Sequence, residues 1–281
     1  MRSRVISPIL LALASACGLS AIWIATYEVE ATSRADRGVQ LGFLNLADSR
    51  AGEVAEWWAH SVDPRPFAVL AAGLVAIALL RRRPRLAAAA AVILGGANVT
   101  TQMIKKLTVD QRAYDLDAWQ GGMGQELWPS GHTTAAMTLL LCLVLVSSHR
   151  WRPLAAAVGT LFVVAVVYSI LLLGWHLPSD VLGGFLVASA WTLVAVAALH
   201  AAEHRWPSHE RRERQLQPLA VVLPAALIAV LCLFAAAGVA LSRPDSVIAH
   251  AIEHSAFMLG APLIGATALA LSTGVALALR R

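Results

Sequence analysis

Apolar runs of about the length that a membrane-spanning helix needs follow one another along most of this chain. They restrict the possible folds more than any single motif, because each run is most simply interpreted as one helical span. Eight such runs lie at 5–25, 65–80, 86–104, 131–147, 154–173, 179–199, 219–241 and 256–279. We therefore expect residues 1–281 to form a single all-α membrane domain, a polytopic helix bundle.

The composition supports this class of protein. Of the 281 residues, 58% are hydrophobic and only 14% are charged, whereas about 25% of the residues of a soluble domain are charged. Basic residues fall in short loops between the apolar runs, so the net charge of +5 does not indicate a nucleic-acid surface. Cys17, Cys142 and Cys232 all lie inside apolar runs, which predicts neither a disulfide framework nor a metal site.

Arginine-rich segments alternate with the apolar runs and predict the topology. If the chain crosses the membrane eight times, most arginines fall on one side, and the positive-inside rule makes that side cytoplasmic. These arginines are Arg2, Arg4, the cluster at 81–85, Arg150, Arg152, the segment 205–214, Arg280 and Arg281. We expect a multi-pass protein of the cytoplasmic membrane with both ends inside. The loops before Ser130 and around His176 then face outside.

The N-terminal part of the chain combines an apolar run with a polar outer segment. A basic start followed by apolar residues is typical of a cleaved signal peptide, but the run continues for the length of a span, so we expect an uncleaved helix. The outer loop 27–64 is acidic, and its apolar residues recur every three or four positions. This spacing predicts one or two amphipathic helices at the membrane surface, with Trp57 and Trp58 near the lipid headgroups.

A polar, glycine-bearing stretch at 128–134 meets the fourth apolar run and carries the strongest chemical signal. Ser130 is a good helix N-cap, so a helix beginning here directs the N–H groups of Gly131 and His132 out of its end. Such an end attracts an anion, phosphate above all, and glycine lets the anion approach closely. His132 can exchange a proton near neutral pH. Taken alone, the stretch is also compatible with a simple helix cap and an interfacial histidine.

Other polar residues fall at the same predicted membrane face. Lys105 and Arg112 follow the third run on the outer side, where they form either a clamp for an anion or a solvated interfacial pair. His176 and Asp180 stand four residues apart, where the fifth run passes into the sixth. We expect these residues and Ser130 to converge over one pocket at the outer ends of the helices.

These residue types suit the cleavage of a phosphate ester. Cations and backbone amides can hold the phosphate oxygens, and a neutral imidazole, His176, can act as the nucleophile. Asp180 can fix the tautomer of His176 and stabilise its charge, and His132 can protonate the leaving oxygen. Each residue alone has a plainer interpretation, His176 as an interfacial histidine and Asp180 as a favourable charge at a helix N-terminus.

The three sets in this order resemble the motifs of the type 2 phosphatidic acid phosphatase superfamily of membrane lipid phosphatases. Its motifs are Lys-x6-Arg-Pro, Pro-Ser-Gly-His and Ser-Arg-x5-His-x3-Asp. Here they read Lys105-x6-Arg112-Ala113, Pro129-Ser130-Gly131-His132 and Ser169-Ile170-x5-His176-x3-Asp180. The resemblance covers roughly residues 85–200 and implies a six-helix phosphatase-like core within 1–200. The segment 201–281, a cytoplasmic basic loop and two further spans, is not part of that core.

The resemblance also implies roles for individual residues. His176 would carry a phosphohistidine intermediate, with His132 as the acid. The residues implied to hold the phosphate are Lys105, Arg112, Ser130 and Gly131. No metal and no other cofactor is implied.

Two positions depart from the family motifs. Ala113 replaces a proline, and Ile170 replaces the arginine that reaches the phosphate. Isoleucine can neither donate a hydrogen bond nor supply charge, so this departure bears on catalytic efficiency rather than on the fold. Lys106 and Arg243 are candidates for a substitute cation.

An unrelated motif competes with this interpretation. His250-x-x-Glu253-His254 matches an inverted zinc-protease pattern, in which two histidines on one helix bind zinc. The sequence offers no convincing third ligand, so we expect an ordinary polar loop over 242–255.

From these residues and the resemblance, we expect an integral membrane phosphatase that acts on a lipid phosphate or diphosphate at the outer face of the cytoplasmic membrane. A polyprenyl diphosphate is the first candidate substrate and a phosphatidate-type lipid the second. One alternative is a phosphotransferase with the same phosphohistidine and a non-water acceptor. The other is a catalytically weak relative that binds or translocates an anionic lipid. The expected partners are the lipid phosphate and the membrane, with no nucleic acid, and the sequence does not indicate an oligomeric state.

Overall fold

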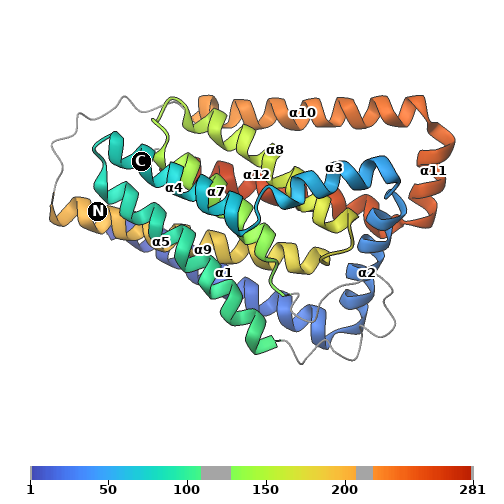
Figure 1. The fold of residues 1–281 in the computed structure, drawn as a ribbon, viewed down its shortest axis with the longest axis horizontal. Coiled ribbons are helices and arrows are strands. Elements are labelled where there is room, and N and C mark those ends of the chain that lie inside the picture. The colour runs from blue at the N-terminus through green and yellow to red at the C-terminus, as the bar shows by residue number, and fades with distance from the viewer. Residues whose placement is uncertain (1, 109–127, 207–217, 280–281) are drawn as a thin grey trace.

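The computed structural model describes residues 2–108, 128–206 and 218–279, and within these ranges the chain forms helices and no strands (Figure 1). The prediction of an all-α fold is confirmed. The helices are α1 (Arg2–Glu28), α2 (Glu30–Asn45), α3 (Ser49–His60), α4 (Pro64–Leu80), α5 (Pro84–Thr108), α7 (Gly131–Val146), α8 (Arg152–Leu172), α9 (Pro178–Arg205), α10 (Pro218–Ser242), α11 (Pro244–Glu253) and α12 (Ser255–Ala278).

Most of these helices are long and apolar enough to cross a membrane. Among the described residues, six pass that test, namely α1, α5, α8, α9, α10 and α12. α3 and α4 pass it together as a pair bent by 50°, and α7 is apolar but only 16 residues long. The chain is therefore a multi-pass membrane protein. The eight runs predicted from the sequence correspond to the six long helices, α4 and α7.

α7 occupies the centre of the bundle. Almost every residue from Thr133 to Val146 is buried, on all sides of the helix. The reason is that α7 contacts α4, α5, α8, α9 and α12. Its apolar residues therefore show no helical periodicity, because a helix that is apolar all round is one that is buried all round.

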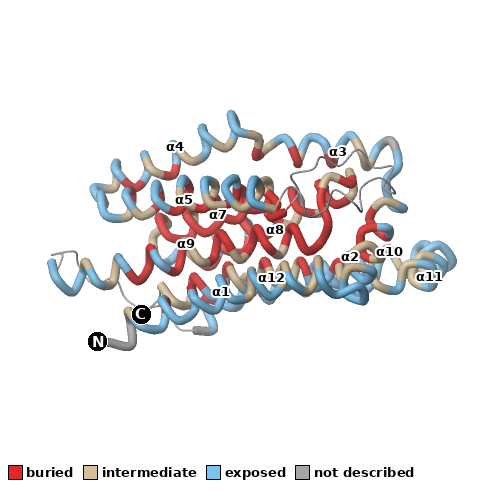
Figure 2. The backbone as a smooth tube through the Cα atoms, turned by 90° about the horizontal axis from the view of Figure 1, so that it is seen from below, coloured by how far each residue is buried: buried red, intermediate tan, exposed pale blue. Residues whose placement is uncertain are grey.

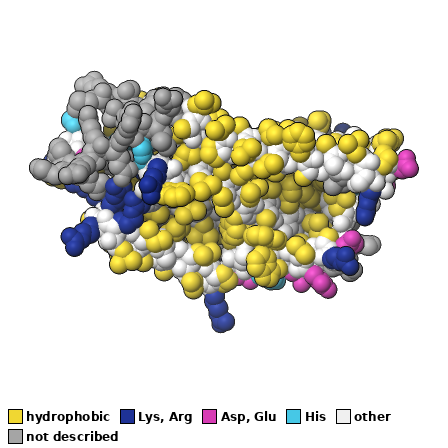
Figure 3. All heavy atoms as spheres, turned by 90° about the horizontal axis from the view of Figure 1, so that it is seen from above, with side chains coloured by type: hydrophobic (Ala, Val, Ile, Leu, Met, Phe, Trp, Pro, Cys, Tyr) yellow, Lys and Arg dark blue, Asp and Glu magenta, His cyan; other side chains and the backbone are white. Residues whose placement is uncertain are grey.

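The outer helices surround this centre and present apolar surfaces. Buried residues gather in α7, α8 and α9, whereas α1, α4 and α10 are exposed along much of their length (Figure 2). α1 packs along α9, and both α10 and α12 pack against α8. Hydrophobic side chains cover the middle of the face in Figure 3, with charged side chains mainly toward its two ends. Such a surface suits lipid tails rather than water.

The segment 27–64, for which the sequence predicted one or two amphipathic helices, contains two, α2 and α3. One face of α2 is buried, including Val39, Gln40 and Phe43, and it packs against α12 and α8. Gln40 Nε2 donates a 2.7 Å hydrogen bond to the carbonyl of Leu171 in the last turn of α8. Trp57 is 67% exposed. Its predicted place at the lipid headgroups stays a prediction.

Arginines join several helices at the end of the bundle where α1 begins and α12 ends (Figure 1). Each binds a carbonyl at or just after a helix C-terminus, where a cation is favourable because it satisfies the last acceptors and the helix dipole. The pairs are Arg81 with Val146, Arg85 with Trp206 at 2.7 Å, and Arg152 with Leu279 at 2.9 Å. These arginine clusters thus share one end of the bundle, as the topology predicted. Which side of the membrane they face stays a prediction.

The segment 242–255 is not the loop that we expected from its polar residues. Residues Pro244–Glu253 form α11. Pro244 is compatible with this helix because it stands at the first position, where its missing N–H is not needed. His250 lies in the last turn of α11 and His254 follows that helix, with 4.7 Å between the two ring centroids. Within the described ranges, no group of three or more His, Cys, Asp or Glu side chains is placed to hold a metal ion.

Candidate active site

Ser130 precedes α7 and anchors it to α9. Its backbone is extended, and its hydroxyl accepts a hydrogen bond from Thr133 N at 3.3 Å, as expected of an N-cap. Its own N–H donates to the carbonyl oxygen of Asp180 at 2.9 Å. Gly184 permits this approach, because a Cβ there would lie 2.8 Å from Thr133 Cβ and 2.9 Å from Ser130 O. The second and third sequence motifs are therefore in direct contact.

His176 and Asp180 form a buried pair at the beginning of α9. Asp180 Oδ2 lies 3.4 Å from His176 Nδ1 and accepts a 2.8 Å hydrogen bond from Leu177 N. The two side chains are only 6% and 0% exposed. The turn before them contains Gly174 with φ of 72°, a conformation that glycine adopts without steric cost. A carboxylate at Nδ1 favours the tautomer protonated there, which leaves the lone pair of the ring on Nε2.

The two histidines predicted to act in catalysis lie next to each other. His132 is the second residue of α7, and its ring centroid lies 6.2 Å from that of His176. The ring of Trp175 packs beside His132, with 5.4 Å between centroids. At this separation the two imidazoles can act on different atoms of one bound group, one as nucleophile and the other as acid.

Asp63 is a member of the site that the sequence analysis did not identify. It precedes α4, at the bend between α3 and α4, yet its carboxylate makes no capping hydrogen bond to α4. Instead, Asp63 Oδ1 lies 3.4 Å from His132 Nε2, and Oδ2 lies 2.8 Å from His60 Nδ1. The His60 ring also packs against Trp175, with centroids 5.4 Å apart. In the sequence, an aspartate before Pro64 indicates only an ordinary helix cap.

Lys105 faces the beginning of α7 from the last turn of α5. Its Nζ lies 3.9 Å from the point that a Cβ on Gly131 would occupy, and the side-chain amide nitrogen of Gln102 lies 3.6 Å from that point. A cation and an amide donor beside a helix N-terminus suit the binding of an anion. Arg112 lies outside the described residues, so its predicted place beside Ser130 stays a prediction.

Comparison with known proteins gives a family match. The family model of the PAP2 superfamily matches residues 64–204, which is half of the chain. The chain belongs to the PAP2 superfamily. Members of this superfamily are phosphatases and phosphoesterases. No curated protein and no solved structure matches the chain.

The PAP2 range begins at the first residue of α4 and ends in the last turn of α9. Within it lie Lys105, Ser130, His132, His176 and Asp180, whereas His60 and Asp63 directly precede it. Neither the family motifs nor the family match therefore indicates the Asp63 carboxylate, and its role becomes visible only from its distance to His132.

Ile170, at the position where the resemblance to the third motif implied an arginine, lies in the hydrophobic core. Its side chain is fully buried, and its carbonyl accepts a 2.9 Å hydrogen bond from Trp175 N. The last turn of α8 thus supports the loop that carries His176 through packing and through a backbone hydrogen bond. At this position α8 contributes no charge to the site.

Proposed function

We propose that this protein is an integral membrane phosphatase that removes phosphate from a lipid phosphate or diphosphate through a phosphohistidine on His176. The observation that carries the proposal is the pair of adjacent imidazoles, with a 6.2 Å separation and a carboxylate on each. Asp180 lies at Nδ1 of His176, and Asp63 lies at Nε2 of His132. Two histidines supported in this way can divide the roles of nucleophile and acid.

In the first step, Nε2 of His176 attacks phosphorus, and the bond between phosphorus and the lipid oxygen breaks. His132 gives its proton to that oxygen, so the lipid leaves as an alcohol or, from a diphosphate, as the monophosphate. Asp180 stabilises the positive charge that develops on the His176 ring. A phosphohistidine and a neutral His132 remain.

In the second step, water attacks the phosphohistidine and His132 takes one of its protons. The bond between phosphorus and nitrogen breaks, inorganic phosphate leaves, and both histidines return to their starting states. The non-bridging phosphate oxygens are held by Lys105, by Arg112, by the hydroxyl of Ser130, and by the N–H group of Gly131. This chemistry requires no other cofactor.

A groove lined by His60 supports a lipid as the substrate. It has a volume of about 710 Å³ and lies at the bend between α3 and α4, lined in part by Trp57, His60, Pro66, Val69 and Leu70. His60 touches both this groove and Asp63, so a tail lying in the groove places its headgroup toward His132. We propose that a polyprenyl diphosphate is the preferred substrate, ahead of phosphatidate-type lipids. By the positive-inside rule, this end of the bundle faces the outside of the cytoplasmic membrane.

Phosphate release from the full-length protein in detergent tests this function. A polyprenyl diphosphate and a phosphatidate should both be offered, with His176→Ala as the control, and acid-labile, base-stable labelling of the protein should be measured. We expect phosphate release and labelling in the unmodified protein and neither in the His176 variant. Phosphate release that persists in that variant would refute the assigned nucleophile.

Ile170 favours one second candidate, a relative with weak catalysis that binds or translocates an anionic lipid. Replacing it by arginine, with thermal unfolding measured alongside because Ile170 is fully buried, separates the two: a guanidinium that reaches the phosphate should accelerate a weakened but folded enzyme by roughly tenfold to a hundredfold. Lipid binding without phosphate release in both forms would support the second candidate. Phosphate transfer to an added alcohol instead of water would indicate a phosphotransferase.

A further inference from the structure

Helix α2 is attached on both sides of the loop that carries His176. Before the loop, Gln40 Nε2 donates a hydrogen bond to the carbonyl of Leu171, and the Gln40 side chain is fully buried. After the loop, Asp36 accepts two hydrogen bonds from Ser179 in the first turn of α9. The proposed nucleophile lies between these two attachments, so α2 is placed to fix its position.

The contact between Asp36 and Ser179 uses both carboxylate oxygens. Oδ1 accepts from the backbone N–H of Ser179 at 2.8 Å, and Oδ2 accepts from the Ser179 hydroxyl at 2.6 Å. This N–H is one of the first of α9, which have no carbonyl partner within their own helix. The N-cap residue of α9 is Leu177, whose apolar side chain cannot accept a hydrogen bond. Asp36 therefore does for α9 what an N-cap side chain would do, although it belongs to another helix.

Ser179 lies between the two members of the proposed nucleophile pair, His176 and Asp180. A shift of the first turn of α9 would therefore move both the imidazole and the carboxylate that lies at its Nδ1. The rate of attack depends strongly on the alignment of the attacking atom, and a displacement of about 1 Å can cost about a hundredfold. The contact from α2 thus bears on the chemistry as well as on the stability of α9.

α2 can serve as a support because it is itself packed tightly against α12. The rings of Phe43 and Phe257 meet edge to face, with 5.0 Å between centroids. A Cβ on Gly42 would overlap the Phe257 side chain. In the same way, a Cβ on Gly260 would overlap Val39. Neither α2 nor α12 lies in the range 64–204, so this support comes from parts of the chain beyond the PAP2 match.

We propose that Asp36 is a positioning residue of the active site, which holds the first turn of α9 so that Nε2 of His176 faces the phosphate. It acts through Ser179 and the backbone of α9. The inference rests on the function proposed for His176. It gives α2, and α12 behind it, a part in catalysis.

Single-turnover kinetics test this role. The full-length protein, in saturating excess, is mixed with farnesyl diphosphate or dioleoylphosphatidate, whichever the unmodified protein hydrolyses faster. Because protein is in excess, the rate constant for phosphate release reports on the folded molecules and not on how many have folded. We expect Asp36→Ala to lower this rate constant by roughly tenfold to a hundredfold, since the nucleophile loses its alignment. Asp36→Asn should lower it by only about threefold to tenfold, because the amide keeps one acceptor oxygen.

Glu30→Ala is the matched control, because it removes a carboxylate from the same helix. Glu30 is exposed and lies 3.8 Å from the exposed Arg34, its partner in an ion pair. We expect its rate constant to stay within about twofold of that of the unmodified protein. An equal loss in Glu30→Ala and Asp36→Ala would overturn the proposal, as would an unchanged rate constant in Asp36→Ala. If Asp36→Ala does not fold, an unchanged rate constant in Asp36→Asn would have the same meaning.

Hydrogen–deuterium exchange separates this proposal from the proposed function. In Asp36→Ala, we expect the amides of residues 177–181 to exchange about tenfold faster than in the unmodified protein, and in Glu30→Ala at the same rate. If the unmodified protein releases no phosphate but shows this difference, the proposed phosphatase is overturned and the support of α9 by Asp36 is upheld. Equal exchange in Asp36→Ala and the unmodified protein would overturn the positioning role, even in an active phosphatase.

Discussion

Asp63 Oδ1 lies 3.4 Å from Nε2 of His132, so the carboxylate at the beginning of α4 adjoins the imidazole at the beginning of α7. The other oxygen of Asp63 is held by His60 at 2.8 Å. A carboxylate fixed on both sides can orient the His132 ring. In the proposed reaction, this ring gives its proton to the leaving group.

Asp63→Asn therefore tests a positioning residue. We expect kcat to fall by about tenfold with little change in KM, because the substitution disturbs the orientation of the general acid and not the binding of substrate. The loss should be larger for a lipid phosphate, whose alcohol leaves poorly, than for an aryl phosphate, whose phenol needs less protonation. Equal losses on both substrates would indicate a structural role only. His60→Gln is the control, since it keeps the direct contact between Asp63 and His132.

Asp180→Asn tests the support of the proposed nucleophile. We expect activity to fall by roughly a hundredfold to ten-thousandfold, because the neutral amide neither fixes the tautomer of His176 nor stabilises its charge. Labelling of the protein by phosphate should be slowed and not abolished, in contrast to His176→Ala. Thermal unfolding should be compared as well, since Asp180 also accepts a hydrogen bond from Leu177 N. A variant with full activity would exclude Asp180 from the reaction.

The two adjacent lysines provide a matched pair. Lys105→Ala removes the cation that faces Gly131, and we expect kcat/KM to fall by roughly tenfold to a hundredfold. Lys106→Ala removes an exposed cation from the next position of the same helix. It should leave kcat/KM within about twofold, because exposed charges contribute little. The reverse order would make Lys106 the phosphate-binding residue.

The close contact between α7 and α9 predicts the effect of a single methyl group. In Gly184→Ala the added Cβ lies within 3 Å of the Thr133 side chain and the Ser130 carbonyl, and the Ser130 carbonyl belongs to the backbone and cannot simply rotate away. We expect a loss of about 1–3 kcal/mol in stability, as for other overpacked sites, together with reduced phosphate release. Gly95→Ala is the control, since a Cβ there meets nothing within 4 Å. An unchanged free energy of unfolding in Gly184→Ala would mean that α7 and α9 move apart at little cost.

The sequence by itself determined the class of the protein and the local chemistry of its motifs. Apolar runs specify membrane helices because burying a long apolar segment in lipid depends on its composition and length, not on its neighbours. Ser130 was predictable as a cap because an N-cap bond closes within four residues. His176 and Asp180 were predictable as a pair because they stand only four residues apart in the chain. Where a rule uses only nearby residues, the sequence contains all the information it needs.

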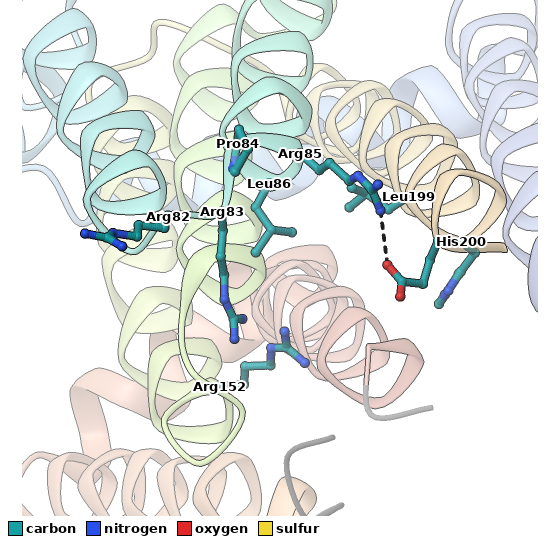
Figure 4. Close-up of a pocket in the computed structure, with 9 residues that line it drawn as sticks. Arg82, Arg83, Pro84, Arg85, Leu86, Arg152, Leu199 and His200 are labelled. Carbon is teal, nitrogen blue, oxygen red and sulfur yellow. Dashed lines mark hydrogen bonds and ion pairs between the residues drawn. The ribbon is translucent and has the colours of Figure 1, made fainter. Parts of the chain in front are cut away.

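Only the tertiary structure decided which distant groups meet. Asp63 and His132 are far apart in the chain, and their contact depends on the bend between α3 and α4 and on the packing of α4 against α7. The central place of α7 also depends on contacts between helices that are distant in the chain. The same holds for the side chains of Arg83 and Arg152, which come from different helices or turns and point toward one another (Figure 4). Hydropathy gives the transfer free energy of each span but not the partner of any of its faces. Those partners follow from packing among all the helices at once, because the shapes of their side chains must fit together.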